Sequence, residues 1–117
     1  MTITEFLEER IAEDEARANA SIANYTPDEW DNPSRWANHY AADVEFWDAH
    51  TPYRVLAECA AKRAIIAVHE TVPTAPGRSD TTCAGCGMAF GERPCPTLRA
   101  LAAVYSSHDD YDSGWAL

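Results

Sequence analysis

Three of the four cysteines lie close together in the stretch TTCAGCGMAFGERPC, residues 81–95. Cys83 and Cys86 have the Cys-x-x-Cys spacing that lets two thiolates reach one metal ion, and the glycines beside them permit a tight turn. Cys95 follows after eight intervening residues and directly precedes Pro96, at a predicted helix start. A thiolate there is stabilised by the positive end of the helix dipole. The spacing therefore predicts a zinc knuckle.

Three thiolates leave a tetrahedral zinc site one ligand short. We favour His69 as the fourth ligand, because a Pro- and Gly-containing loop joins it to Cys83 and is long enough to fold back. Cys59, His108 and a water molecule are the alternatives. Cys59 precedes His69 by ten residues on the same predicted helix, about 15 Å along its axis, so the two cannot both bind. The predicted site is structural, with a bound Zn²⁺ and the ligands His69, Cys83, Cys86 and Cys95.

Other uses of the cysteines are less favoured. A redox-active Cys-x-x-Cys pair belongs at a strand–helix junction of a βαβ unit, and nothing before Thr81 is patterned as a strand. Free reduced thiols are the remaining alternative. A zinc deaminase requires His-x-Glu followed by Pro-Cys-x-x-Cys, but here Glu70 directly follows His69 and Cys95 does not begin a Cys-x-x-Cys. The sequence contains no phosphate-binding glycine loop or Ser/His/Asp arrangement, so no catalytic residues are predicted.

Two acidic groups resemble metal sites in composition only. The first is the C-terminal group His108, Asp109, Asp110 and Asp112, and the second is Asp43, Glu45, Asp48 and His50. No spacing in either group fixes a coordination geometry, so neither is predicted to be a site.

Three segments have helical periodicity and must position the cysteines. Residues 1–25 begin with Thr2 and Glu5 at capping-box spacing, and their apolar stripe is narrow. Residues 52–70 begin with Pro52 after a capping Thr51, and residues 96–108 form the third helix. Between the second helix and the cysteines, VPTAPGRSD predicts a loop.

Residues 26–50 are irregular and rich in aromatic side chains. Two short strands, near 35–40 and 43–47, are one alternative, and short helical turns are the other. We expect the aromatic residues to supply core to a small domain, with an exposed recognition surface as the alternative. These residues are Trp30, Trp36, Tyr40, Phe46 and Trp47.

The predicted fold is a single, mainly α domain over residues 1–117 with a zinc knuckle between the second and third of three helices. The irregular middle segment includes a short β-hairpin as an alternative. The acidic tail, residues 109–117, either docks through Trp115 or frays.

The chain carries 19 acidic and 9 basic side chains, a net charge of −10. Residues 1–50 alone contain 12 Asp/Glu against 3 Lys/Arg, which is −9. An acidic surface repels phosphate backbones, so nucleic acid is excluded as a favoured partner and a protein with a basic surface is expected. There is no signal-peptide pattern and no apolar run of about 20 residues. We therefore expect a soluble, cytoplasmic protein that binds no membrane, and the oligomeric state is not predicted.

Three segments resemble a family of small proteins of unknown function found in actinobacteria and their phages. The segments are MTITEFLEERIAEDEARA, HTPYRVLAECAAKRAIIAVH and CPTLRALAAVYSSHDDYDSGW, in that order, and they cover about half of the chain. The family's run before the second helix has Asp where this chain has Thr51. Residues 26–50 match poorly. The resemblance implies an actinobacterial or actinophage source, and it implies no particular activity.

Taken together, these features predict a non-enzymatic, zinc-binding accessory protein that binds a host protein through its acidic surface. The alternative is a zinc hydrolase or deaminase-like enzyme, which needs an open coordination position at the metal.

Overall fold

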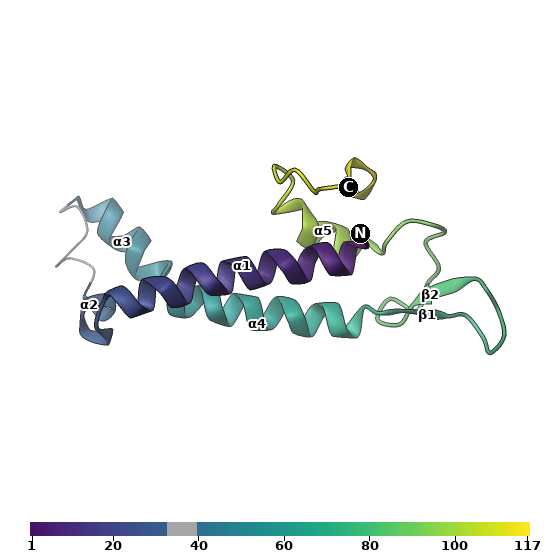
Figure 1. Cartoon of the computed structure of the whole chain (residues 1–117), viewed down its shortest axis with the longest axis horizontal. Coiled ribbons are helices and arrows are strands. Elements are labelled where there is room, and N and C mark those ends of the chain that lie inside the picture. The colour runs from purple at the N-terminus through teal and green to yellow at the C-terminus, as the bar shows by residue number, and fades with distance from the viewer. Residues whose placement is uncertain (33–39) are drawn as a thin grey trace. The chain divides into compact units, whose positions relative to one another are not determined.

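The structure of the protein is a computed structural model that describes residues 1–32 and 40–117 (Figure 1). Within these ranges the chain is mainly helical, as predicted, but it forms five α-helices where three were expected. The bounds are α1 Ile3–Asn24, α2 Pro27–Asp31, α3 Ala41–Ala49, α4 Pro52–Val68, β1 Thr71–Pro73, β2 Thr81–Cys83, α5 Pro96–Ala103 and a short 3-10 helix, η2, Ser113–Trp115.

The two additional helices lie in the aromatic-rich middle segment. Residues 43–47 belong to α3, so the helical alternative is correct there and the strand alternative is wrong, and most of the alternative strand near 35–40 lies outside the described residues. Thr26 and Glu29 form a reciprocal capping box at the start of α2, in which each side chain accepts a backbone N–H of the other residue. This local capping stabilises a helix even over five residues.

The chain divides into two compact units. Unit 1 consists of residues 1–11 and 62–117, and unit 2 consists of residues 12–61. The helices α1 and α4 each contribute one part to unit 1 and the other part to unit 2.

The core of unit 1 is built around Phe6, which is fully buried. Its ring has edge or tilted contacts with four aromatic rings of the C-terminal region at centroid distances of 5.1–6.3 Å: Tyr105, His108, Tyr111 and Trp115. Such packing adds roughly 0.5–1.5 kcal/mol per pair to the burial of apolar area. Trp115 is thus docked, the first of the two alternatives for the acidic tail.

The predicted helix starts are confirmed. The backbone N–H of Thr2 donates to Glu5 Oε2 over 2.7 Å, and the N–H of Glu5 donates to Thr2 Oγ1 over 3.1 Å. The hydroxyl of Thr51 accepts the N–H of Arg54 at the start of α4. These pairs satisfy N–H groups that have no partner inside a helix.

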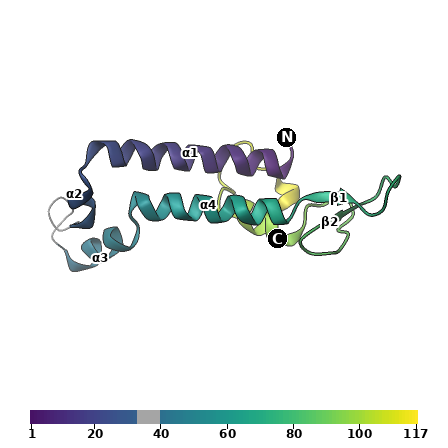
Figure 2. The same cartoon turned by 90° about the horizontal axis from the view of Figure 1, so that it is seen from below.

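A β-hairpin follows α4 where a loop was expected (Figure 2). Strands β1 and β2 pair antiparallel, with Thr71 opposite Cys83 and Pro73 opposite Thr81. In the connecting turn the N–H of Arg78 donates to the carbonyl of Ala75, and Gly77 has a φ of +79°. Pro followed by a glycine with positive φ is typical of a type II turn. The three-residue strands are too short to show an alternating pattern in the sequence.

The third predicted helix, α5, is shorter than expected. It ends at Ala103, and consecutive turns carry the chain from there to Tyr111. Arg93 and Arg99 then hold the C-terminal segment by donating hydrogen bonds to backbone carbonyls between Gly114 and Ala116.

Unit 2 contains the later part of α1, the helices α2 and α3, and the beginning of α4. Its buried side chains include Ala18, Trp30 and Cys59, and the ring of Tyr25 meets that of Trp30 edge-on at 5.2 Å. The expectation that the aromatics of residues 26–50 form core is correct for Trp30 but wrong for Tyr40, Phe46 and Trp47, which are 75%, 55% and 40% exposed. Trp36 lies outside the described residues.

None of the helices in the described part of the chain is long and apolar enough to cross a membrane.

Candidate metal centre

Four side chains of unit 1 converge in the structure: His69, Cys83, Cys86 and Cys95. One ligand atom from each lies within 4.8 Å of the others. The Nδ1 atom of His69 is 3.4 Å from the Sγ of Cys83, 3.5 Å from that of Cys86 and 3.8 Å from that of Cys95. These are the four residues predicted as ligands, and the cluster they form could bind a metal ion.

The distances match the size of a tetrahedral site. With a metal–nitrogen bond of about 2.05 Å and a metal–sulfur bond of about 2.3 Å, a tetrahedral angle separates nitrogen from sulfur by about 3.6 Å. The three observed separations, 3.4–3.8 Å, lie around that value. The nitrogen–sulfur spacing is therefore compatible with one ion held by Nδ1 and the three sulfurs, whose ligand atoms all lie within 4.8 Å of one another.

A tight turn places the first two thiols. The N–H of Gly87 donates to the carbonyl of Cys83 over 2.8 Å, and the N–H of Cys83 donates to the carbonyl of Met88 over 3.0 Å. Gly87 has a φ of +67°, a conformation that favours glycine. Strand β2 thus delivers Cys83 directly into the turn, and Cys86 faces it across the Cys-x-x-Cys loop.

Gly85 allows this turn to approach the end of α4. A Cβ atom at position 85 would lie 2.7 Å from the carbonyl oxygen of Val68 and 2.9 Å from Nδ1 of His69. The N–H of Ala84 also donates to the carbonyl of Glu70 over 2.8 Å, which fastens the turn to the residue after His69. The contact between the turn and the helix end brings the histidine to the thiols.

Cys95 comes from the opposite side of the cluster, at the N-cap of α5. It is buried, and its carbonyl accepts the N–H of Arg99 as the helix begins. The position of Cys95 at the start of this helix is the one predicted from the sequence.

The pKa values of Cys83 and Cys86 differ strongly. Burial raises the pKa of Cys83, but hydrogen bonds from the Cys86 backbone and from the side chains of His69, Cys86 and Cys95 outweigh it and lower this pKa to about 7. Burial and the neighbouring Cys83 raise the pKa of Cys86 to about 11. Of these two thiols, Cys83 is therefore the one that loses its proton more readily. A bound cation would favour deprotonation of both.

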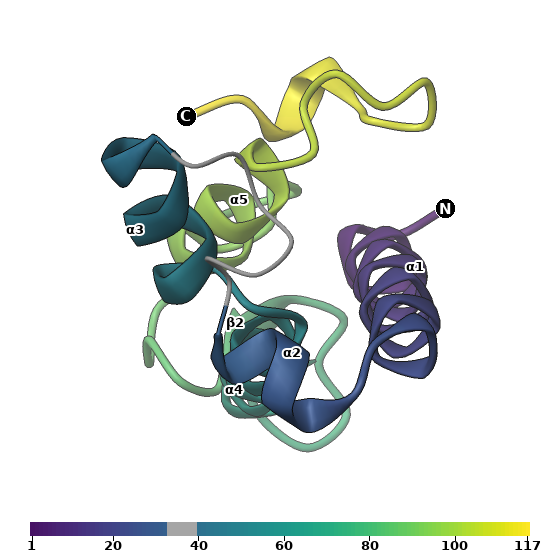
Figure 3. The ribbon, with the colours of Figure 1, turned by 90° about the vertical axis from the view of Figure 1, so that its left-hand side faces the viewer.

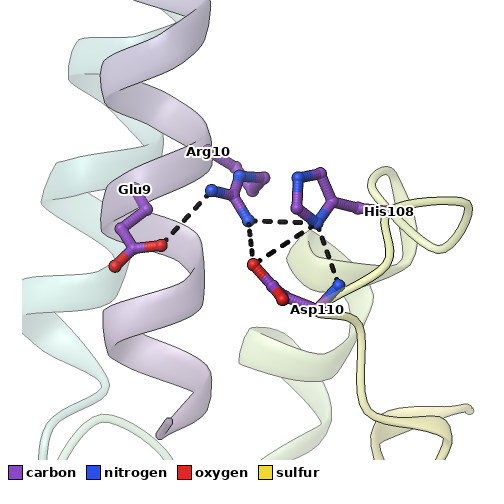
Figure 4. A network of polar contacts seen from close by, with 4 residues as sticks. All are labelled: Glu9, Arg10, His108 and Asp110. Carbon is purple, nitrogen blue, oxygen red and sulfur yellow. Dashed lines mark hydrogen bonds and ion pairs between the residues drawn. The ribbon is translucent and has the colours of Figure 1, made fainter.

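The other candidate ligands lie elsewhere. Cys59 is a buried thiol of unit 2 and does not belong to the cluster. His108 belongs to a polar network in which its Nδ1 lies 3.2 Å from Arg10 Nη1 and accepts the N–H of Asp110 over 3.1 Å (Figure 4).

Arg10 is the centre of this network and was not singled out in the sequence. Its side chain is buried, yet it contacts Glu9 at 3.3 Å and Asp110 at 3.6 Å, and its guanidinium lies 5.2 Å from the Phe6 ring centre. The contacts compensate a buried charge, which is otherwise costly. Arg10 follows Phe6 by four residues on α1, a spacing that could have indicated a shared buried face.

The remaining acidic groups do not form a metal cluster in the described residues. Asp112 caps η2 by accepting the N–H of Gly114 over 2.7 Å, and Asp110 contacts Arg10. His50 donates Nδ1–H to the carbonyl of Phe46 over 2.9 Å, at the end of α3. These contacts give each group a structural role.

Comparison with known proteins identifies a family. The profile of a family of unknown function, DUF6221, matches residues 1–117. The chain belongs to this family. No curated protein and no solved structure gives a match. Membership of DUF6221 assigns no activity, so the chemistry of the cluster and the surface of the two units are the basis for a functional proposal.

Proposed function

We propose that this member of DUF6221 is a non-enzymatic zinc protein that acts by binding a protein partner with a basic surface. In this proposal the zinc ion is structural and is held by His69, Cys83, Cys86 and Cys95. The resemblance of the three segments described above supports a role as an accessory protein of an actinobacterium or its phage.

The observation that carries the metal proposal is the set of three nitrogen–sulfur distances around His69. Three sulfurs and one imidazole nitrogen at tetrahedral spacing are a usual ligand set for structural zinc. Magnesium and calcium prefer oxygen ligands, and iron–sulfur clusters usually take four thiolates. The donor set therefore favours zinc over the other common metals.

Zinc would connect three parts of unit 1 that are distant in sequence: the end of α4, the turn after β2 and the start of α5. Binding free energy at a site that exists only in the folded chain stabilises the fold, by roughly 10–16 kcal/mol in small zinc peptides. The ion would add to the backbone hydrogen bonds that already join the turn to the end of α4.

Four protein ligands support the non-enzymatic assignment. A tetrahedral zinc bound by four side chains has no coordination position left for a water molecule or a substrate carbonyl. The competing enzyme hypothesis requires one of the four residues to leave the ion and a water to replace it.

The charge distribution supports a basic partner, because most of the negative charge of the chain lies in unit 2. Residues 12–61 contain ten Asp/Glu and three Arg, so 10 − 3 gives a net charge of −7 out of the total of −10. In unit 1, by contrast, Glu8 forms an ion pair with Arg63 and Glu9 with Arg10. Complementary charge accelerates association and disfavours other acidic partners.

The test of the metal site is metal analysis combined with cobalt substitution. Protein produced with zinc supplied should contain about one zinc per chain. Replacing zinc by Co²⁺ should give the intense visible bands of tetrahedral cobalt and a sulfur-to-cobalt charge-transfer band. Absence of zinc would refute the metal proposal, and a cobalt spectrum of a five-coordinate, water-bound ion would favour the enzyme.

A further inference from the structure

Helix α3 presents an unusual surface. None of its residues is buried, although it contains Val44, Phe46 and Trp47. In Figure 3, α2 and α3 belong to the part of unit 2 nearest the viewer. Phe46 and Trp47 keep 55% and 40% of their surface exposed, and exposed apolar surface of this kind often marks an interaction site.

The aromatic side chains of α3 are held in a fixed arrangement. The ring of His50 stacks on that of Phe46 at 4.4 Å with an interplanar angle of 16°, while its Nδ1–H donates to the Phe46 carbonyl. The ring of Trp47 stands edge-on to Phe46 at 5.7 Å and 82°. Rigid aromatic groups lose little conformational entropy on binding, which is why they are favoured at protein interfaces.

A pocket opens beside these rings within unit 2. Its volume is about 270 Å³. Trp47 and His50 line it from the α3 side, and α1, α2 and α4 contribute Ala18, Trp30, Pro52 and Val55. Small-molecule sites usually measure roughly 300–1,000 Å³, so this pocket is better suited to one side chain of a larger partner than to a whole ligand.

The charge around the pocket is mainly negative. Residues 26–32 and 40–50 contain six carboxylates and no Lys or Arg, and Glu45 and Asp48 are exposed on α3 next to the aromatic rings. Arg17 at the pocket is paired with Asp14 at 3.3 Å. A negative surface around an apolar pocket is complementary to a cationic segment that also carries an apolar side chain.

We propose that Glu45, Phe46, Trp47, Asp48 and His50, the α3 surface, bind a cationic segment of another protein and that the adjacent pocket receives an apolar side chain of that segment. The inference rests on the proposed function and specifies where the basic partner binds. Unit 2 of a second copy of this chain would bring a net charge of −7 against −7, and nucleic acids and anionic membranes are repelled in the same way.

The probe is a synthetic amphipathic helix of Lys and Leu without tryptophan. Two matched peptides replace Lys by Glu or Leu by Ser. Binding to the full-length, zinc-loaded protein is followed by backbone amide NMR and tryptophan fluorescence. The Lys/Leu peptide should bind saturably and shift the amides of residues 41–50 and of the pocket, and both control peptides should bind much more weakly.

Variants test whether binding depends on the α3 surface or on the net charge of the protein alone. Glu45→Gln with Asp48→Asn should weaken binding at least severalfold, and Trp47→Ala by roughly tenfold or more, as for an interface hot spot. Trp47→Phe should restore part of the affinity. The matched control, Glu92→Gln with Asp109→Asn, removes the same charge from exposed positions of unit 1 and should have little effect.

The outcomes distinguish failure of the α3 surface proposal from failure of the proposed function. Equal weakening by the two double variants, or shifts confined to unit 1, would overturn the α3 surface while leaving an acidic binding protein in place. Binding of single-stranded DNA or of phosphatidylglycerol vesicles at the same residues would also overturn it. Failure of every cationic peptide to bind would overturn both proposals.

Discussion

Gly85 leaves no space for a side chain next to His69, because a Cβ atom there would lie 2.9 Å from Nδ1. We therefore predict that Gly85→Ala displaces the histidine or the end of α4 and lowers metal affinity by about 10–100-fold, as supporting residues of metal sites do. The measurement is competition for zinc with a chromophoric chelator.

Gly77→Ala is the control for this variant. Gly77 also needs a positive φ, so its replacement costs about 1 kcal/mol of stability, but no atom within 4 Å would meet the new Cβ. If both variants lose zinc equally, Gly85 does not act through its contact with His69.

The identity of the fourth ligand is testable with histidine and cysteine variants. His69→Ala should lose zinc much more readily than His50→Ala, His108→Ala or Cys59→Ala, because His69 is the one of these four residues that belongs to the cluster and lies within 3.8 Å of the three sulfurs. Zinc content after gel filtration in mild chelator is the readout. Loss of zinc from Cys59→Ala with retention in His69→Ala would contradict the assignment.

Zinc retention should depend on pH with a defined sign. The ion binds thiolates, so protons compete with it and affinity rises with pH. At a pH between about 7 and about 11, zinc must displace the proton of Cys86. At a pH below about 7 it must also displace the proton of Cys83. The fall in apparent affinity should therefore steepen as the pH decreases through about 7. Chelator competition at several pH values measures this, and an affinity independent of pH would argue against thiolate ligation.

Two arginines of α1 should differ strongly in their contribution to stability. Arg10 is buried and contacts His108, Asp110 and Phe6, so Arg10→Ala should lower the free energy of unfolding by about 2 kcal/mol. Arg17 is mostly exposed and forms a local ion pair with Asp14, three residues before it, so Arg17→Ala should cost less than about 1 kcal/mol. Urea denaturation of zinc-loaded protein compares them, and equal costs would show that burial of Arg10 adds nothing.

Much of the candidate site could be predicted from the sequence because its signals are local. The Cys-x-x-Cys spacing, the glycines of the turn and the Cys-Pro pair at the start of α5 each act over a few residues. The capping pair of Thr2 and Glu5 is equally local, and it was found in the structure at the predicted position. His69 could be favoured by its reach alone, since the connecting loop permits its approach to Cys83.

Other features depend on contacts between distant residues and were decided by the tertiary structure. Arg10 and His108 are 98 positions apart, so the spacing of Arg10 and Phe6 on α1 could indicate a shared face but not the partners that this charged side chain would meet there. Strand β2 is only three residues long, and its pairing with β1 rather than its own pattern makes it a strand. The exposure of Phe46 and Trp47 likewise could not be predicted from the sequence, because an apolar residue has the same hydrophobicity whether or not the fold places a neighbour over it.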